Sequence, residues 1–376
     1  MPVPIVGVIG GGQLARMMVP QALELGIEIR VLAEAEGSSA RLAATQVGDY
    51  RDLETVRDFA RGVDVITFDH EHVPQEILQA LLADGVVVHP GPHALEFAQD
   101  KLAMRRRLAE LGAPMPEWAE VRSEAELDAF IAEHDGAAIL KTPRGGYDGH
   151  GVRVVRAGSD GADWFGDFEA LLVEELVDFR RELAQLVARR PSGEIVAWPL
   201  VETVQQNGVC KEVLAPAPGA SAREAEVTRQ IAEQIASSLD VTGVLAVELF
   251  ETTDDRVLVN ELAMRPHNSG HWTMDGARTS QFEQHLRAVL DLPLGDASAR
   301  DRATVMINIL GGPQHEAITD RFGAVMARHP EAKLHTYGKS ARPGRKVGHV
   351  NVSGDDLDAV AYAARAAAAM FDDEES

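Results

Sequence analysis

The sequence contains almost no cysteine. Cys210 is the single cysteine among 376 residues, so the chain by itself can form neither a disulfide nor a cysteine-based zinc site. This scarcity is typical of proteins in a reducing compartment, and we expect a cytoplasmic protein. Cys210 lies in a strand-like stretch, which favours a structural thiol over a nucleophile.

Long apolar runs and an excess of positive charge are also missing. No run approaches the roughly 20 apolar residues needed to span a bilayer, and the N-terminus shows no secretory signal pattern. The 36 basic and 59 acidic residues give a net charge of −23, which repels nucleic acid and anionic membranes. We therefore expect no nucleic-acid or membrane partner. A local cluster of cations can still bind a small phosphorylated ligand, because salt screens distant charges within about 10 Å.

The first 95 residues alternate between strand and helix patterns. Apolar runs predict strands at residues 5–9, 27–32, 63–68 and 86–89, separated by helical patterns ending near residue 25 and at 53–61 and 75–83. This rhythm predicts a doubly wound, Rossmann-like domain. The first turn, GGGQLA, matches G-x-G-x-x-A, and acidic Glu34 follows about 20 residues later. Two interpretations stay open: a dinucleotide site, or a turn that serves another phosphorylated ligand.

The carboxyl ends of these strands should form the functional edge of the domain. Gln13 and Leu14 lie in the first turn, and Asp69-His-Glu-His-Val73 follows a later strand. Glu71 is well placed there to accept hydrogen bonds from a sugar. His70 and His72 lack a complete set of metal ligands, so we interpret them as unligated polar residues.

A Pro/Gly-rich linker at residues 89–92 separates this domain from a region of mixed patterns. We expect helices at 95–111 and 222–239 and strands at 170–177, 181–189 and 194–201. The first helix carries Lys101 and the run Arg105-Arg-Arg107, which we interpret as a solvated face.

A glycine-rich hairpin is the clearest candidate for phosphate binding. The stretch KTPRGGYDGHG, residues 141–151, lies between two short apolar runs. Its glycines allow backbone N–H groups to turn inward as an anion site, and Lys141 adds a positive charge. Taken alone, the stretch is more typical of an ordinary flexible turn, and the other motifs of the chain favour phosphate binding.

Two later strands carry acidic residues among apolar neighbours. Glu248 lies within residues 243–250, and Glu261 ends residues 256–262. A carboxylate on a buried strand requires a compensating cation, which could be a basic side chain or a metal ion. Two carboxylates on neighbouring strands favour Mg²⁺ together with nucleotide phosphates.

The C-terminal part adds a polar loop and a cluster of cations. In the loop RPHNSGH, His267 and His271 are four residues apart, but the segment lacks the other features of a helical zinc site. The tract GKSARPGRKVGHV, residues 338–350, fails the P-loop pattern at residue 333. Its cations include Lys339, Arg342 and Arg345, and they fit a clamp for a monophosphate or carboxylate as well as a basic surface loop.

Placed in order, these motifs resemble the ATP-grasp superfamily along nearly the whole chain and, within it, the 5-(carboxyamino)imidazole ribonucleotide synthase family. The matching stretches are GGGQLARM, TFDHEHVP, AQDKLAM, LKTPRGGYDGHG, VEELV, VNELAMRPHNSGHWT and YGKSARPGRKVGHVN. The resemblance implies a multidomain α/β and α+β protein with an ATP-grasp fold. Its expected parts are a Rossmann-like pre-ATP-grasp domain (1–95), an ATP-grasp domain (96–298) with a lid around 115–175, and a small β-rich C-terminal domain (299–376).

The resemblance also implies an ATP-dependent carbon-nitrogen ligase of purine biosynthesis. Such an enzyme uses bicarbonate to carboxylate aminoimidazole ribonucleotide through carboxyphosphate, usually as a homodimer and with a mutase as the next enzyme. By motif, the implied catalytic residues are Tyr147, Asp148, His150 and Arg265. The implied ATP-binding residues are Lys101, Lys141, Gly145, Gly146, Glu174, Glu175, Val177 and Glu182. The implied substrate-binding residues are Gln13, Leu14, Glu71, His267, Asn268, Lys339, Arg342 and Arg345, and Glu248 and Glu261 would hold Mg²⁺.

One position departs from the family pattern. The family loop usually reads Y-D-G-[R/K]-G, and here the cationic position is His150, which is fully charged only near or below its ordinary pKa of about 6.5. Two other functions fit parts of the sequence: another ATP-grasp ligase, such as a formate-dependent glycinamide ribonucleotide transformylase, and a nucleotide sensor or dinucleotide-binding protein built on the first glycine turn.

Overall fold

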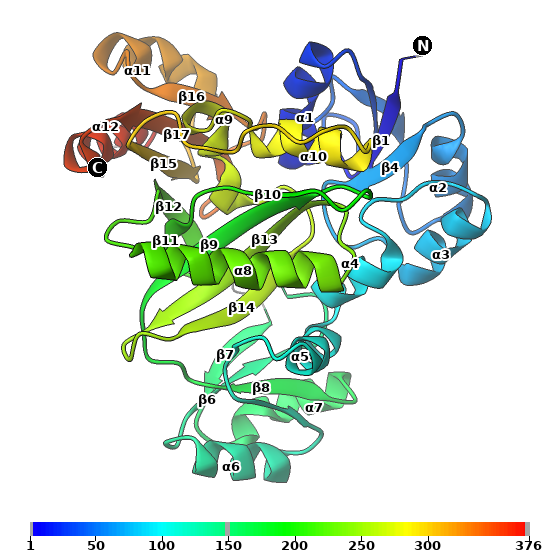
Figure 1. Ribbon diagram of the computed structural model, residues 1–376, viewed down its shortest axis with the longest axis vertical. Helices are drawn as coiled ribbons and strands as arrows, with labels where there is room; N and C mark the ends of the chain where they lie inside the picture. Colours follow the sequence, from blue (N-terminus) through cyan, green and yellow to red (C-terminus); the bar gives the residue numbers. More distant parts are fainter. Residues whose placement is uncertain (1–2, 147–150, 373–376) are drawn as a thin grey trace.

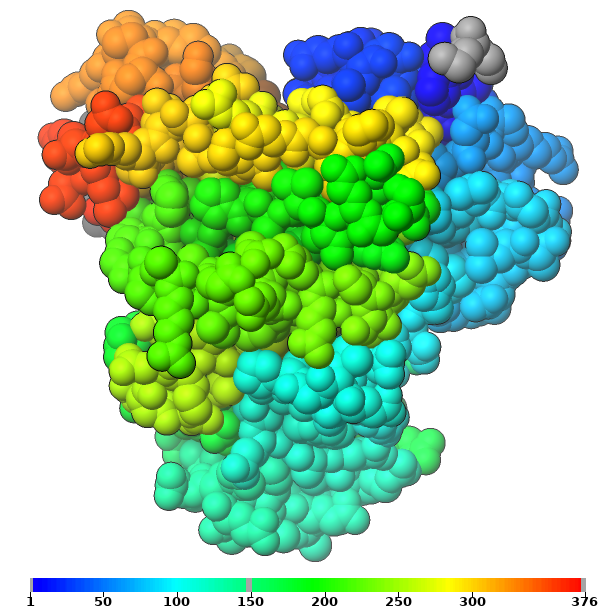
Figure 2. Space-filling view, in the orientation of Figure 1, coloured from blue at the N-terminus to red at the C-terminus, as the bar shows by residue number. Residues whose placement is uncertain are grey.

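The computed structural model describes residues 3–146 and 151–372 and contains, in this part of the chain, three β-sheets (Figure 1). A parallel sheet lies near the N-terminus, a long antiparallel sheet crosses the middle, and a small antiparallel sheet forms a lobe at the end opposite both termini (Figures 1 and 2). We name them the N-terminal, central and lid sheets. In these described residues no helix is both long and apolar enough to cross a membrane.

The N-terminal sheet has the predicted parallel α/β architecture, with strand order β3-β2-β1-β4. Its elements are β1 (Ile5–Ile9), α1 (Gln13–Glu24), β2 (Glu28–Ala33), β3 (Ala44–Val47), α2 (Leu53–Ala60), β4 (Val65–Phe68) and α3 (Gln75–Ala83). Strand β1 is central and almost wholly buried, as expected for an apolar parallel strand covered on both faces. The strand predicted at 86–89 is wrong: only a bridge between Ile66 and Val88 forms there. Strand β3 escaped prediction because ATQV is short and only partly buried.

The lid sheet follows a pair of helices. The helices and strands of this region, including the four strands of the lid sheet, are α4 (Pro92–Gln99), α5 (Lys101–Glu110), β5 (Trp118–Val121), α6 (Glu124–Glu133), β6 (Ala138–Lys141), β7 (Val152–Val155), α7 (Ala162–Asp167) and β8 (Leu171–Glu175). The single helix predicted at 95–111 is wrong, because Asp100 has an extended backbone and its carboxylate caps α5 by accepting the Ala103 N–H at 3.0 Å. The antiparallel pairing of β6 with β7 confirms the hairpin around residues 141–151.

The central sheet carries the remaining strands in the order β14-β13-β9-β11-β12-β15-β17-β16. Its elements are β9 (Phe179–Arg189), β10 (Ile195–Ala197), β11 (Val201–Gln206), β12 (Val209–Ala215), α8 (Ala222–Ser238), β13 (Gly243–Thr252), β14 (Val257–Ala263), α9 (Thr273–Gly276), α10 (Gln281–Val289), β15 (Ala303–Leu310), α11 (Phe322–Arg328), β16 (Lys333–Thr336), β17 (Lys346–Gly354) and α12 (Leu357–Ala369). Residues 194–201, predicted as one strand, divide between β10 and β11. Strand β12 contains Cys210, which was expected in a strand-like stretch and is partly buried there.

The C-terminal strands extend the central sheet, since β12 pairs with β15 and β15 pairs with β17. Helix α12 packs on β15 and β17, and its buried alanines share an apolar cluster with Val305, Val350 and Phe371. A second apolar cluster joins the N-terminal and central sheets, from Ile9 to Met264. The carboxyl ends of β1 and β4 are thereby held against the end of β14, where most of the candidate residues gather.

Candidate active site

Two lysines from different elements meet acidic partners between the lid and the central sheet. Lys101, the first residue of α5, contacts Glu261 at 2.8 Å. Lys141, the last residue of β6, contacts Glu174 at 2.6 Å and the side-chain oxygen of Asn260 at 3.1 Å. Both ammonium groups therefore lie beside the carboxylates expected to serve ATP and magnesium.

Arg105 belongs to this group although the sequence reasoning placed it on a solvated face. Its side chain is 0% exposed and its Nε donates to Glu174 at 2.5 Å. The solvated interpretation of the arginine run was therefore wrong for Arg105, while Arg106 is exposed. The spacing could have revealed it, because Arg105 lies four residues after Lys101 and on the same face of α5.

Glu174 is ionised despite its burial. Burial opposes ionisation, yet Lys141 and Arg105 lower the pKa of this carboxyl group to about 2. Its carboxylate thus forms ion pairs with both Arg105 and Lys141. Glu175 instead accepts the backbone N–H of Glu117 at 3.0 Å, and Val177 lies just beyond β8, in the connection to β9. The Glu175 N–H in turn donates to the Glu117 carbonyl at 2.9 Å, so Glu175 is engaged with Glu117 and its expected contact with adenine stays a prediction.

The base of the glycine hairpin is well defined. The Thr142 N–H donates to the Gly151 carbonyl at 2.9 Å, and the Lys101 N–H donates to the Pro143 carbonyl at 2.9 Å. Gly145 has φ +81, a conformation that favours glycine, and Gly146 follows it. The predicted residues Tyr147, Asp148 and His150 lie outside the described residues.

Glu248 and Glu261 face one another across two strands. They are direct partners in the antiparallel pairing of β13 with β14, and both side chains remain accessible, at 34% and 43% exposure. Burial, followed by the charges of Glu261 and Glu182, raises the pKa of Glu248 to about 7. Burial alone would raise the pKa of Glu261, but Lys101 lowers it. Glu182, on neighbouring β9, has a raised pKa because it is buried.

This pair fits a magnesium ion that also binds nucleotide phosphates. Two accessible carboxylates supply oxygen ligands, and like charges held close together favour a bound cation. Within the described residues no group of three or more His, Cys, Asp and Glu side chains could hold a metal ion. The remaining ligands would therefore come from the nucleotide and from water, as is usual for Mg²⁺.

The raised pKa of Glu248 predicts proton release when magnesium binds. Because the metal ion requires the ionised carboxylate, binding of Mg²⁺ with ADP should release about 0.9 proton from Glu248 at pH 6, about 0.5 at pH 7 and about 0.1 at pH 8. Calorimetry in buffers of different ionisation enthalpy measures this number. Glu248→Gln is the control. The nucleotide releases the same protons with both proteins, so the difference in proton release between wild type and this variant reports Glu248 alone. An equal release by both proteins at pH 6 would contradict the prediction.

An ion pair links the N-terminal and central sheets. Glu71, after β4, accepts from the Arg265 Nε at 2.7 Å and from the Met264 N–H at 2.9 Å. Burial would lower the pKa of Arg265, but Glu71 raises it. The guanidinium is therefore a fixed cation, oriented by Glu71 and 24% exposed.

The next loop adds neutral polar groups. His267 Nε2 lies 3.2 Å from Glu248, while its Nδ1 accepts the Ser269 N–H. Burial lowers the pKa of His267 well below its ordinary value, so the ring that lies beside Glu248 is neutral. Asn268 is buried and exchanges side-chain hydrogen bonds with Asn308. This loop thereby connects the expected metal carboxylate to the expected substrate side.

The predicted phosphate clamp is only partly assembled. Lys339 donates to Gln13 at 2.7 Å, and Lys339 and Arg345 line a recess of about 280 Å³ with Gly11, Gly12 and Glu34. The structure does not bring Arg342 there: it lies exposed in the loop before β17 and lines neither this recess nor its larger neighbour. Leu14 is 5% exposed and packs in an apolar cluster, so its side chain cannot line the recess.

The glycine turn after β1 is already filled by acidic side chains. Asp69 accepts the Ala15 N–H at 2.8 Å, and a Cβ at Gly12 would lie 1.9 Å from an Asp69 oxygen. Glu34 accepts the Gly11 N–H at 3.0 Å, and its hydrogen bond with His70 is the main cause of a pKa of about 2. The turn needs glycine for close approach of Asp69. Two carboxylates at the N-terminus of α1 oppose a pyrophosphate there, which disfavours the dinucleotide interpretation.

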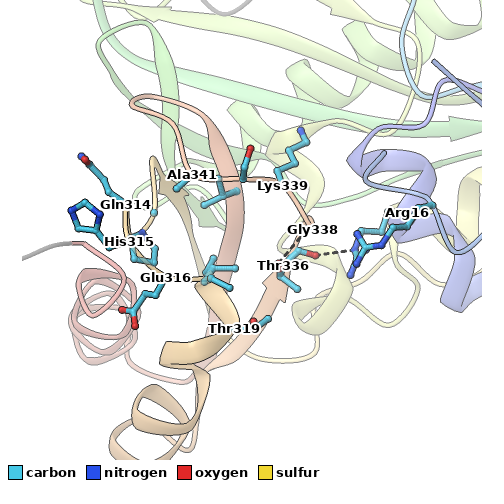
Figure 3. Close-up of a pocket in the computed structure, with 16 residues that line it drawn as sticks. Arg16, Gln314, His315, Glu316, Thr319, Thr336, Gly338, Lys339 and Ala341 are labelled. Carbon is cyan, nitrogen blue, oxygen red and sulfur yellow. Dashed lines mark hydrogen bonds between the residues drawn. The ribbon is translucent and has the colours of Figure 1, made fainter. Parts of the chain in front are cut away.

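A larger cavity of about 620 Å³ lies between α1 and the C-terminal strands (Figure 3). Arg16 reaches from α1 to the Thr336 carbonyl at 3.0 Å, and also donates to the Ser39 carbonyl at 3.0 Å. These bonds tie β16 to the N-terminal sheet and help to hold Lys339 opposite Gln13. The sequence reasoning missed Arg16, because no local pattern relates it to residues more than 300 positions away.

Family comparisons cover the described regions. Residues 3–99 match the ribonucleotide synthetase preATP-grasp domain, residues 106–282 match the ATP-grasp domain, and residues 304–363 match the phosphoribosylaminoimidazole carboxylase C-terminal domain. The three matches follow one another in the order expected from the motifs.

Individual relatives agree with these matches. The chain is 54% identical over 362 residues to an N5-carboxyaminoimidazole ribonucleotide synthase of Mycobacterium tuberculosis (94% of this chain, 84% of the relative). It is 48% identical over 379 residues to the Corynebacterium ammoniagenes enzyme of the same name (97% and 91%). A crystal structure of the Aspergillus clavatus synthase with ADP and 5-aminoimidazole ribonucleotide superposes with a TM-score of 0.89 at 32% identity, covering 98% of both chains. The chain therefore belongs to the N5-carboxyaminoimidazole ribonucleotide synthase family of ATP-grasp ligases.

Proposed function

We propose that this chain carboxylates 5-aminoimidazole ribonucleotide with ATP and bicarbonate to give 5-(carboxyamino)imidazole ribonucleotide, ADP and phosphate in purine biosynthesis. One observation carries the proposal: Glu248 and Glu261 are paired across two strands. Lys101 and Lys141 lie beside this pair, and the Glu71–Arg265 ion pair lies next to it. This arrangement offers one region for a metal-bound triphosphate and an adjoining one for a second, anionic substrate.

The reaction requires two transfers that balance with these substrates. A bicarbonate oxygen attacks the γ-phosphorus of ATP, which releases ADP and forms carboxyphosphate. The substrate amine then attacks the carboxyl carbon, a C–N bond forms, phosphate leaves and the amine loses a proton. Magnesium would neutralise phosphate charge when held by Glu248 and Glu261.

The chain's own residues would position the reacting groups. Lys101 and Lys141 would exchange their acidic partners for ATP phosphates. Arg265, held by Glu71, would face the developing carboxylate, while Lys339 and Arg345 would bind the monophosphate of the ribonucleotide. Gln13, which already contacts Lys339 at 2.7 Å, would orient that lysine.

Asp148 is our candidate for orienting, and deprotonating, the attacking amine. We expect Asp148→Asn to lower carboxylated product formation at saturating substrate by about 100-fold, because the amide cannot accept the proton. Product formation and ADP release should be measured separately. A wild-type rate of product formation in this variant would remove Asp148 from the chemistry.

The decisive experiment measures ADP formation with and without aminoimidazole ribonucleotide and bicarbonate. Rapid ADP formation should require magnesium and both co-substrates, and labelled bicarbonate should appear in the product. Incorporation of labelled formate would instead indicate a transformylase. Absence of stimulation by the imidazole nucleotide would leave a nucleotide-binding protein and contradict the proposal.

Several wider features stay predictions. The division into residues 1–95, 96–298 and 299–376 stays a prediction, because one apolar cluster spans the N-terminal and central sheets and β12 pairs with β15. Limited proteolysis would test it. A homodimer and transient contact with a mutase rest on the family resemblance, and a cytoplasmic location rests on the scarcity of cysteine. Sedimentation of the purified chain at micromolar concentration checks the first of these.

A further inference from the structure

Arg105 joins the lid sheet to the strand that carries Glu261. Its guanidinium donates from Nε to Glu174 of β8 at 2.5 Å, from Nη1 to the Val259 carbonyl at 3.1 Å and from Nη2 to the Asn260 carbonyl at 2.7 Å. All three kinds of nitrogen are therefore used. The side chain is 0% exposed, and the bonds to Glu174 and to the Val259 carbonyl are buried.

The two carbonyl groups belong to an irregularity in the strand pairing. Glu248 pairs with Glu261 but the next residue, Leu249, pairs with Val259, which leaves Asn260 as an extra residue in β14. Such a bulge changes the direction of neighbouring side chains. Here the side chain of Asn260 contacts Lys141 and the next residue, Glu261, contacts Lys101. By bonding both carbonyls, Arg105 holds the segment that directs these two contacts.

Glu174 explains why a second cation is needed. It is 2% exposed and lies between Arg105 and Lys141. If Lys141 turns to a nucleotide phosphate, Glu174 loses one of its two cations, and an unpaired buried carboxylate is strongly unfavourable. Arg105 cannot make the same move, because its other nitrogens are bound to the bulge carbonyls.

We propose that Arg105 is a positioning residue of the nucleotide site, which keeps Glu174 compensated and fixes the bulge at Asn260 while Lys141 and Lys101 transfer to nucleotide phosphates. The proposal rests on the proposed function only in taking an adenine nucleotide as the ligand. Because ADP binding needs neither bicarbonate nor the imidazole nucleotide, its failure can be distinguished from a failure of the carboxylation chemistry.

The test compares Arg105→Met and Arg105→Lys with Arg106→Met. Arg106 follows on the same helix and also reaches the lid sheet, through Glu120, but its side chain is 54% exposed. We expect Arg105→Met to weaken Mg²⁺-dependent ADP binding and to raise the KM for ATP by about tenfold or more. Lysine keeps the positive charge but cannot make both bonds to the carbonyl groups. We therefore expect Arg105→Lys to weaken ADP binding by about threefold. The KM for aminoimidazole ribonucleotide should change less than about twofold in all three proteins.

Proton counting gives a second readout that a purely structural role would not change. In Arg105→Met, transfer of Lys141 to ADP leaves Glu174 without a cation, so this carboxylate should take up about one proton on ADP binding. Wild type and Arg106→Met should show no such additional uptake in calorimetry with two buffers. The proposal would be overturned if Arg105→Met bound ADP as tightly as wild type and took up no additional proton. It would also be overturned if the KM for ATP and the KM for aminoimidazole ribonucleotide rose by the same factor. If Arg105→Met does not fold, an unchanged ADP affinity in Arg105→Lys overturns it.

Discussion

Glu261→Gln should lower the maximal rate of ADP formation by about two to three orders of magnitude at saturating substrates. Glu261 faces Glu248 across the strand pair and contacts Lys101 at 2.8 Å. The amide keeps the size of the side chain but removes the negative charge from the expected magnesium site and from Lys101. The loss should therefore fall on kcat as well as on the apparent magnesium affinity.

The matched control is Glu212→Gln in the same sheet. Glu212 also forms an ion pair, with Arg365, at 2.8 Å and is similarly a carboxylate on a central strand, but it lies outside the candidate site. Its maximal rate should stay within about twofold of wild type. A Glu261→Gln enzyme as active as the Glu212→Gln control over a magnesium titration would refute the metal assignment.

Arg265→Met should both destabilise the protein and abolish most of its activity. The substitution leaves Glu71 with the Met264 N–H but without its guanidinium partner, which costs about 3 kcal/mol for a largely buried pair. Loss of the cation near the developing carboxylate should lower kcat/KM for the imidazole nucleotide by at least about 100-fold. Thermal unfolding and steady-state kinetics measure the two effects separately.

A double variant separates stability from catalysis. Adding Glu71→Gln to Arg265→Met removes the unpaired carboxylate, so the melting temperature should return most of the way to that of wild type. Activity should stay low, because the guanidinium is still missing. Recovery of activity together with stability would show that Arg265 has no direct part in substrate binding or chemistry.

The two strand glutamates and the hairpin could be predicted because their signals are local. Glu248 and Glu261 interrupt apolar strand patterns, and the glycine run identifies residues 141–151 as a loop between strands. Strand pairing then brought the two glutamates into direct register. The break at Asp100 was missed because the apolar pattern continues through it, while one capping hydrogen bond divides the helix.

Contacts between distant segments could not be predicted in this way. Arg105 looks like one member of a surface arginine run, yet it is enclosed between β8 and β14. Arg342 looks equivalent to Arg345, but only Arg345 turns into the recess beside the first glycine turn. Neighbouring residues of one type differ here because burial depends on what packs against each side chain.

The sequence by itself determined the succession of an α/β unit, a glycine hairpin, acidic strands and a cationic tract, since periodicity and turn residues are local properties. Only the tertiary structure decided which charges meet. It closed the first glycine turn with Asp69, paired Glu71 with Arg265 and enclosed Arg105 beside Glu174. The physical reason is that a buried charge must find its partner in space, and the packing of three sheets brings together residues as far apart in the sequence as Glu71 and Arg265, which are separated by 194 positions.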